Sequence, residues 1–372
     1  MSGEAGDIPG LDPAINRAPL PRSRWGRRSP ERPDAGFGSD RGGATYAALD
    51  LGTNNCRLLV ARPSGEGFRV VDAFSRIVRL GEGVSSSGCL SEAAIARALG
   101  ALAICRNKMK NKGVTRARLI ATEACRAAQN GPQFLARVSD ELGLTLEVID
   151  RETEANLAAT GCTPLIDPQA NGAILFDIGG GSSELVHLAR SQKGRGGPPL
   201  PQIRGWISVP HGVVTLAERH GGIVVSRESY EAMVSEVAGL IAPFVREHAA
   251  EATTGTHMLG TSGTVTTIAG VHLNLKRYDR NRVDGCWMSA QQINAVIERL
   301  LAMSYEERVA SPCIGAERAD LVLAGCAILE AIRRAFPCPR LRVADRGLRE
   351  GMLVQMMRED GAWSGGNQAA MS

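Results

Sequence analysis

Two segments of the chain share one pattern, in which a polar turn rich in glycine, asparagine or serine separates two apolar runs. The first segment is Tyr46–Ala61, with the turn Gly-Thr-Asn-Asn, and the second is Ala173–Leu188, with the turn Gly-Gly-Gly-Ser-Ser. Apolar runs of strand length around such a turn predict a β-hairpin. Asp50 and Asp177 close the first run of each segment and lie 127 residues apart, about one domain length. The repeat therefore predicts two related α/β domains whose hairpin turns face a shared cleft.

Amphipathic helices are predicted wherever apolar residues recur at three- and four-residue intervals. Short apolar runs predict strands at Ala117–Ala121 and Leu144–Ile149, and the glycine-rich segment Met258–Thr267 is expected to lead from a strand into a helix. The run Ser191–Pro201, rich in glycine and proline, is expected to form an exposed hairpin loop. The predicted helices are Ser91–Lys110, Pro132–Leu142, Thr153–Gly161, Arg227–His248, Ser289–Met303 and Glu317–Ala335.

The spacing of these elements sets the expected domain boundaries. We expect a first domain at 45–168 and a second at 169–358, followed by a flexible tail at 359–372. Residues 1–44 are rich in Pro, Gly, Arg and Asp and have no core-forming pattern, so they are predicted to be a disordered tail. They contain no apolar run long enough for a signal peptide or a membrane span, so no membrane partner is expected.

Composition narrows the class of function. The 372 residues, 44% of them hydrophobic, suffice for two domain cores. With 43 basic and 39 acidic residues the net charge is only +4, so no specific nucleic-acid partner is expected. The nine cysteines are scattered without a CxxC pair, and the six histidines show no metal-binding spacing. Neither a disulfide framework nor a zinc site is expected, and the cysteines indicate a cytoplasmic protein.

The two polar turns contain the residue types that phosphate binding needs. In the first turn a glycine lets the backbone approach a ligand, and a threonine and two asparagines can donate hydrogen bonds to phosphate oxygens. In the second turn three glycines leave the amides able to wrap an anion, and two serines add hydroxyl groups. The candidate phosphate-binding residues are Gly52, Thr53, Asn54, Asn55, Gly179, Gly180, Gly181, Ser182 and Ser183.

Asp50 and Asp177, each at the end of its strand, are suitable ligands for Mg²⁺, directly or through water. This ion prefers oxygen donors and keeps part of its hydration shell. Capping of the turn by the same side chain is the structural alternative for each aspartate. Their matching positions in the two hairpins favour the metal role.

Three charged residues after the predicted strands are candidates for the remaining chemistry. Arg126 follows the strand Ala117–Ala121, at the sheet edge where open α/β folds bind ligands. A guanidinium can grip phosphate through two hydrogen bonds, so Arg126 is a candidate phosphate clamp, with a salt bridge to Glu123 as the alternative. Glu152 and Glu154 lie in the first turn of the next helix, where the helix dipole alone would explain them. The residues do not decide which glutamate is the general base.

In order along the chain, these motifs resemble those of the exopolyphosphatase/guanosine pentaphosphate phosphatase (Ppx/GppA) family, within the sugar kinase–Hsp70–actin superfamily. The likeness extends from about Tyr46 to Met357 and implies two actin-like (ribonuclease H-like) domains that flank a cleft. The motifs are Asp50–Arg57, Ala121–Arg126, Glu152–Ala155, Asp177–Glu184, Gly260–Gly263 and Gly347–Gly351.

The resemblance implies that water hydrolyses a terminal phosphate with the help of Mg²⁺ or Mn²⁺. It selects Glu154 as the base, assigns Glu184 as a metal-supporting carboxylate and favours Arg126 as the phosphate clamp. Without the resemblance, Glu184 is as readily an exposed strand residue. The chain departs from the family pattern at Thr53 and Asn55, often serine in the family, and at Asn156, often arginine. It is also a short form, without the C-terminal helical domains of longer members.

The predicted function is therefore release of terminal phosphate from inorganic polyphosphate, with the 5′-phosphate of guanosine pentaphosphate (pppGpp) as the alternative substrate. A sugar or acid kinase of the same superfamily would need an aspartate base in the first domain, and no such motif is found. A non-catalytic sensor of polyphosphate or an alarmone is a further alternative, but it gains little from four carboxylates around an anion. The assembly, including a homodimer, is left open.

Overall fold

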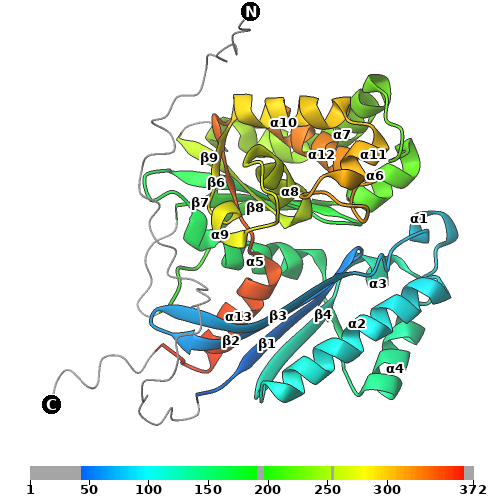
Figure 1. The fold of residues 1–372 in the computed structure, drawn as a ribbon. Helices are drawn as coiled ribbons and strands as arrows, with labels where there is room; N and C mark the ends of the chain where they lie inside the picture. Colours follow the sequence, from blue (N-terminus) through cyan, green and yellow to red (C-terminus); the bar gives the residue numbers. More distant parts are fainter. Residues whose placement is uncertain (1–42, 191–196, 253–254, 364–372) are drawn as a thin grey trace, which may run out of the picture.

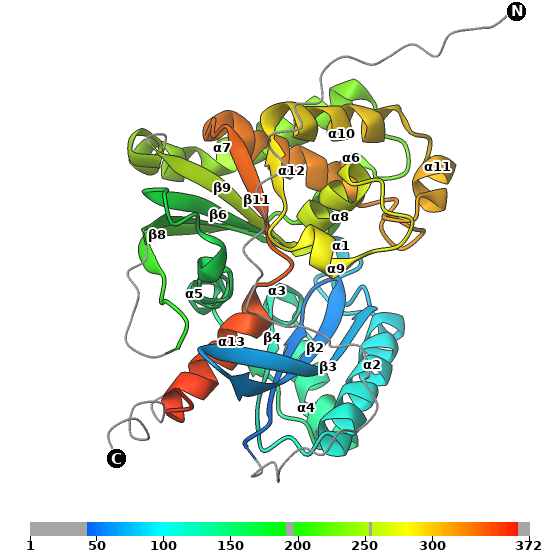
Figure 2. The same ribbon diagram turned by 60° about the vertical axis from the view of Figure 1, so that its left-hand side comes forward.

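The computed structural model describes residues 43–190, 197–252 and 255–363. Within these ranges the chain forms two β-sheets, each covered by helices, with two further helices between them (Figures 1 and 2). Almost all of the tail predicted at 1–44 lies outside the described residues. The same holds for the first part of the loop predicted at Ser191–Pro201 and for the end of the tail predicted at 359–372.

Both sheets are built on the same strand order. Among the described residues, the first sheet has the order β3-β2-β1-β4-β5 and the second β10-β11-β9-β6-β7-β8. In each sheet the first strand of a hairpin pairs antiparallel with its partner and parallel with the next strand, as β1 does with β2 and β4, and β6 with β7 and β9. The predicted duplication and the two-domain actin-like α/β fold are thus confirmed. The strands are β1 (Tyr46–Leu51), β2 (Asn55–Ser64), β3 (Gly67–Ile77), β4 (Arg116–Ala121), β5 (Glu147–Val148), β6 (Gly172–Ile178), β7 (Ser183–Ala189), β8 (Gln202–Val209), β9 (Thr256–Thr261), β10 (Trp287–Ser289) and β11 (Arg340–Val343).

Each predicted helix is present in the described ranges. The stretch predicted at Glu317–Ala335 becomes helical only at Val322, because the residues before it form turns. The strand predicted at Leu144–Ile149 is reduced to the two exposed residues of β5. The helices are α1 (Val84–Ser87), α2 (Glu92–Asn111), α3 (Glu123–Ala127), α4 (Gly131–Leu142), α5 (Arg151–Cys162), α6 (Val213–His220), α7 (Arg227–Ala252), α8 (Ser262–His272), α9 (Arg280–Val283), α10 (Ala290–Ala302), α11 (Tyr305–Ala310), α12 (Val322–Ala335) and α13 (Leu348–Glu359).

The layer between the sheets consists of α5 and α13, which cross at glycine residues. A side chain added at Gly351 of α13 would lie 2.0 Å from the carbonyl oxygen of Leu157, and one added at Gly161 of α5 would lie 2.0 Å from that of Gly347. The backbones therefore touch directly. Buried residues of α13, such as Met352, pack in one core with β1 and β2 of the first sheet. The predicted domains 45–168 and 169–358 are each continuous in sequence. In space, α13 packs against the first sheet, although its residues belong to the second of these ranges.

Polar contacts also join the two halves at the rim of the cleft. Both terminal nitrogens of Arg79 lie 2.9 Å from the carboxylate of Asp320. Glu218 of α6 accepts hydrogen bonds from the backbone N–H of Gly83, at 2.9 Å, and from the hydroxyl of Ser85. Arg79 has a φ of 46°, which is unfavourable for a side-chain-bearing residue. Among the helices that the structure describes, none has the length and apolar composition needed to span a membrane.

Candidate active site

A cavity of about 100 Å³ lies where the two hairpin turns meet. Both turns, the N-terminal ends of α5, α8 and α13, and the residue before α3 contribute to its wall. Arg126 and Ser183 are the predicted site residues that do not line it. Those that do are Asp50, Gly52, Thr53, Asn54, Asn55, Glu154, Asp177, Gly179, Gly180, Gly181, Ser182 and Glu184.

The turns come together because the second one has no side chains in the way. A Cβ at Gly180 would lie 3.0 Å from Cβ of Thr53, and a Cβ at Gly181 would lie 2.7 Å from its Oγ1. Each turn is closed by a matching backbone hydrogen bond, from Gly52 to Asn55 at 2.8 Å and from Gly179 to Ser182 at 3.0 Å. The triple glycine therefore lets two turns, far apart in sequence, form one wall.

The side chain of Ser183 lies on the face of β7 that points away from the cavity. Successive strand residues point to opposite faces, so Ser182 and Glu184 face the cavity and Ser183 faces away. Its hydroxyl donates to the carbonyl of His211 at 2.8 Å. The hydroxyl predicted to contact phosphate is thus engaged in tying β7 to the loop before α6.

The three predicted metal-binding carboxylates, Asp50, Asp177 and Glu184, line the cavity together. In the first hairpin Asp50 stands opposite Arg57, and at the equivalent place in the second hairpin Asp177 stands opposite Glu184. Burial raises the pKa of Asp50, an effect that Arg57 and Arg349 oppose. Burial raises the pKa of Asp177 to about 6. Burial, together with the negative charge of Asp177, raises the pKa of Glu184 to about 7, although Ser182 and Ser208 donate to its Oε1 at 2.8 Å.

This donor set suits a hydrated divalent cation better than an ion enclosed by protein. In the part of the chain that the structure describes, no three His, Cys, Asp or Glu side chains converge closely enough to hold a metal. Mg²⁺, however, is commonly held by one or two carboxylates, several waters and substrate phosphate. The pKa values of Asp177 and Glu184 are raised chiefly because burial removes water from the two carboxylates, a cost that a bound cation would offset. The buried side-chain oxygens of Asn54 and Asn55 also lack a hydrogen-bond partner in the described residues. The residues therefore fit Mg²⁺ with water ligands.

The structure separates the two glutamates that are candidates for the base. Glu154 lines the cavity, whereas Glu152 points to solvent. Burial raises the pKa of Glu154 well above its usual value, the Glu184 carboxylate adds to the rise, and Arg126 opposes it. A carboxylate with a raised pKa is a stronger base than an exposed one, which makes Glu154, beside a phosphate-sized cavity, the candidate to accept a proton from water.

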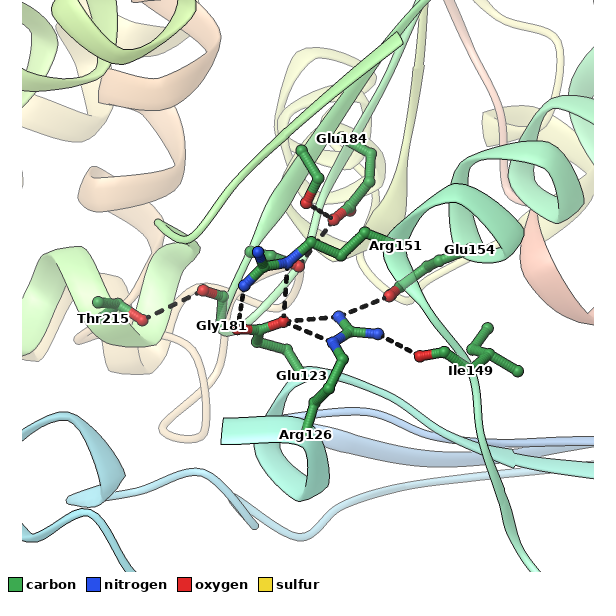
Figure 3. A network of polar contacts seen from close by, with 10 residues as sticks. Glu123, Arg126, Ile149, Arg151, Glu154, Gly181, Glu184 and Thr215 are labelled. Atoms are coloured by element: carbon green, nitrogen blue, oxygen red, sulfur yellow. Dashed lines mark hydrogen bonds and ion pairs between the residues drawn. The ribbon is translucent and has the colours of Figure 1, made fainter. Parts of the chain in front are cut away.

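Arg126 lies beside the carboxylate of Glu154 and contacts it (Figure 3). Its Nη2 is 3.0 Å from Oε2 of Glu154, its Nη2 and Nε are 2.6 and 3.0 Å from Oε2 of Glu123, and its Nη1 donates to the carbonyl of Ile149. The salt bridge with Glu123 considered as an alternative is therefore present. With these partners in place, Arg126 holds protein carboxylates and is not aimed at the cavity.

Three other arginines line the cavity, and one of them, Arg346, is paired with Asp284, which leaves Arg57 and Arg349. Neither makes a hydrogen bond or ion pair within the described ranges. Arg57 and Arg349 lie within the motifs Asp50–Arg57 and Gly347–Gly351, but the sequence pattern alone indicates no role for them. The signal for Arg57 is that it follows Asp50 by seven residues, as Glu184 follows Asp177. The N-terminal ends of α5, α8 and α13, each of 11 or 12 residues, add positive potential at the same place.

A larger groove of about 780 Å³ adjoins the cavity and shares Asn55, Arg57 and Arg349 with it. It lies between β3 and the loops that precede α9 and α12. Arg76 of β3 stacks on Phe74, with its guanidinium carbon 5.4 Å from the ring centre. Glu317 and Asp345 are the acidic residues of the groove wall. Its arginines are Arg57, Arg76, Arg280, Arg318 and Arg349.

Comparisons with known proteins agree with this geometry. The model of the Ppx/GppA phosphatase family matches residues 59–360. A Haemophilus influenzae protein, provisionally named an exopolyphosphatase, is 26% identical over 83% of this chain and 90% of its own length. The solved Aquifex aeolicus Ppx/GppA family member is 28% identical with a TM-score of 0.67, over 85% of this chain and 98% of that one. An exopolyphosphatase from Cytophaga hutchinsonii, 23% identical over 85% of this chain and 98% of its own, has the same fold with a TM-score of 0.75.

Proposed function

Because the chain belongs to the Ppx/GppA phosphatase family, and is thus a phosphoanhydride hydrolase, we propose that it releases the terminal phosphate of inorganic polyphosphate. The observation that carries the proposal is the continuity between a small cavity with a buried base and a larger groove with five arginines in its wall. A terminal phosphate needs only the cavity. The remaining phosphates of a chain need successive cations, which Arg57, Arg76, Arg318 and Arg349 can provide, whereas Arg280 is paired with Asp345 and Glu350.

We assign the two hairpin turns to the terminal phosphate. Backbone N–H groups of the glycine turn, with the side chains of Thr53, Asn54 and Ser182, surround the cavity and can donate to its oxygens. Arg57 and Arg349 take the place of the clamp expected from Arg126, because they line the cavity and Arg126 does not.

Glu154 is assigned as the residue that accepts the proton of the attacking water. Its Oε2 is held by Arg126, whereas no hydrogen bond to its Oε1 is formed by the described residues. One oxygen is therefore available to a water at the cavity wall. Phosphoryl transfer depends mainly on positioning and on stabilising charge, which these groups supply from preformed positions.

Asp50 and Asp177 would hold Mg²⁺ or Mn²⁺, with Glu184 behind Asp177 on the neighbouring strand. When bound, the ion offsets negative charge on the phosphoryl oxygens. The nine cysteines are all unpaired in the structure, which supports the proposal of a reducing, cytoplasmic location.

The test is phosphate release by the purified protein. Polyphosphates of several lengths, tripolyphosphate, pppGpp, ATP and a simple phosphate monoester are compared at equal Mg²⁺. The groove leads us to expect the highest kcat/KM for long polyphosphate and little activity on the monoester. A higher kcat/KM for pppGpp than for every polyphosphate would transfer the assignment to the alternative substrate, and binding without phosphate release would contradict a hydrolase.

A further inference from the structure

Four side chains at the cavity alternate in charge, in the order Arg151, Glu123, Arg126 and Glu154 (Figure 3). Arg151 and Glu154 lie on neighbouring turns of α5, and Glu123 and Arg126 lie in α3. Nη2 of Arg151 is 2.8 Å from Oε1 of Glu123, whose Oε2 receives two hydrogen bonds from Arg126. Arg126 makes one further contact to a carboxylate, to Glu154 at 3.0 Å, and its Nη1 donates to the carbonyl of Ile149.

The negative charge of Glu123 is unfavourable at this place. The residue is buried and lines the cavity, where its negative charge repels any phosphate that enters. A buried carboxylate is tolerated only with charged or hydrogen-bonding partners, which the two arginines provide. Across the cleft it also meets the glycine turn, because a Cβ at Gly181 would lie 3.1 Å from its Cγ. Glu123 is thus held by Arg126 and Arg151 and packed against Gly181, although its charge opposes the binding of phosphate. We therefore look for its role in a step other than binding.

The effect of Glu123 is to divide the hydrogen bonds of Arg126. Nε and Nη2 of Arg126 both point at Glu123, so only one contact remains for Glu154. Arg126 contacts two carboxylates in the structure, those of Glu123 and Glu154. Without Glu123, only that of Glu154 would remain. A carboxylate held by both hydrogen bonds of a guanidinium is a weaker base, and neither of its oxygens is left for water.

We propose that Glu123 is a positioning residue for hydrolysis, which holds Arg126 so that Glu154 keeps one oxygen directed to the attacking water. The inference rests on the proposed function, in which Glu154 is the base. It extends that function by one residue whose own charge is unfavourable to the substrate. Arg151 contributes to this positioning, because it donates a hydrogen bond to the second carboxylate oxygen of Glu123.

The test is a double-mutant cycle on polyphosphate hydrolysis. E123Q removes the charge and keeps the shape, so kcat should fall up to about 100-fold, as for other displaced catalytic groups. KM should stay equal or decrease, because a negative charge leaves the cavity wall. Since Glu123 acts through Glu154, adding E123Q to an E154Q protein should lower kcat almost no further. Glu147→Gln, which removes another arginine-bound carboxylate at an exposed site, is the matched control and should keep the wild-type kcat.

Three outcomes would overturn the inference: an unchanged kcat in E123Q, an increase in KM as the main effect, or the same further loss of kcat in the E154Q background. If E154Q itself keeps the wild-type rate, the base assignment fails together with the inference. If E154Q is slow and the two losses multiply, only the role of Glu123 fails. Thermal unfolding of each variant checks its fold. Should E123Q not fold, E123D takes its place in the cycle, because it keeps the charge but reaches less far, and the same cancellation is expected.

Discussion

Replacing Glu184 by glutamine should stabilise the metal-free protein at alkaline pH, although it removes a residue of the active site. Glu184 is enclosed by protein next to Asp177, and these surroundings raise its pKa to about 7. In an unfolded chain a glutamate titrates at about 4.3. Between these values the folded protein holds more protons than the unfolded chain. The free energy of unfolding of the wild type therefore falls as pH rises through this window and is constant with respect to this group above about pH 7.

The size of the effect follows from the two pKa values. A tenfold change in proton affinity corresponds to about 1.4 kcal/mol, so ionising Glu184 in the folded protein costs on the order of 3 kcal/mol at pH 8. Glutamine avoids this cost, and its side-chain oxygen can still accept from Ser182 and Ser208, which both bond Oε1. For a chain of this length, 3 kcal/mol corresponds to roughly 4–5 °C in Tm.

The assay is thermal unfolding of wild type and Glu184→Gln after removal of divalent cations with EDTA. The variant should have the higher Tm at pH 8, and the difference should vanish near pH 3, where the wild-type carboxyl is protonated in both states. Comparing the two proteins cancels the titration of shared groups that do not interact with Glu184. Added Mg²⁺ should raise the Tm of the wild type more than that of the variant, because the ion compensates the same charge. A variant that unfolds at a lower temperature than wild type at pH 8 without metal would refute the reasoning.

Three further predictions follow from the site and the layer between the sheets. Glu154→Gln should lower kcat by about 10²–10⁴-fold, the usual effect of a positioned base, whereas Glu152→Gln, at an exposed position, should keep the wild-type rate in the same phosphate-release assay. Arg76→Ala, at the groove but outside the cavity, should raise KM for long polyphosphate and leave tripolyphosphate hydrolysis unchanged; equal effects on both would contradict a role in holding the chain. Gly351→Ala should destabilise the protein by more than about 1 kcal/mol in denaturant unfolding, because its methyl group would meet the carbonyl of Leu157, and an unchanged midpoint would contradict the direct backbone contact.

Features that depend on neighbours in the chain could be predicted from the sequence. The two hairpins arise from strand-length apolar runs around Gly-rich turns, and the duplicated aspartates follow from them. The direction of Ser183 does not follow from the polar composition of the turn, because β7 begins at that residue and its alternation turns the hydroxyl away from the cavity.

Features that depend on distant partners could not be predicted in the same way. The direction in which Arg126 points is set by Glu123, Glu154 and the carbonyl of Ile149, which meet only when α3 and α5 pack together. The roles of Arg57 and Arg349 required knowing that strand β2 and the start of α13 border one cavity. The return of α13 to the first sheet likewise depends on tertiary packing, since its helical pattern is the same in either domain.

The glycine crossing of α5 and α13 has a mechanical consequence for the cleft. With no side chain between the two backbones, the helices have no rotamers to rearrange and little room to slide, so a change in the angle between the sheets has its pivot at this crossing. Gly347, one of the touching residues, itself borders the cavity, whereas the contacts of Arg79 and Glu218 lie at the rim. Points near a pivot move little and points at the rim move most. We therefore expect opening of the cleft to displace the contacts at the rim more than the residues that border the cavity next to Gly347.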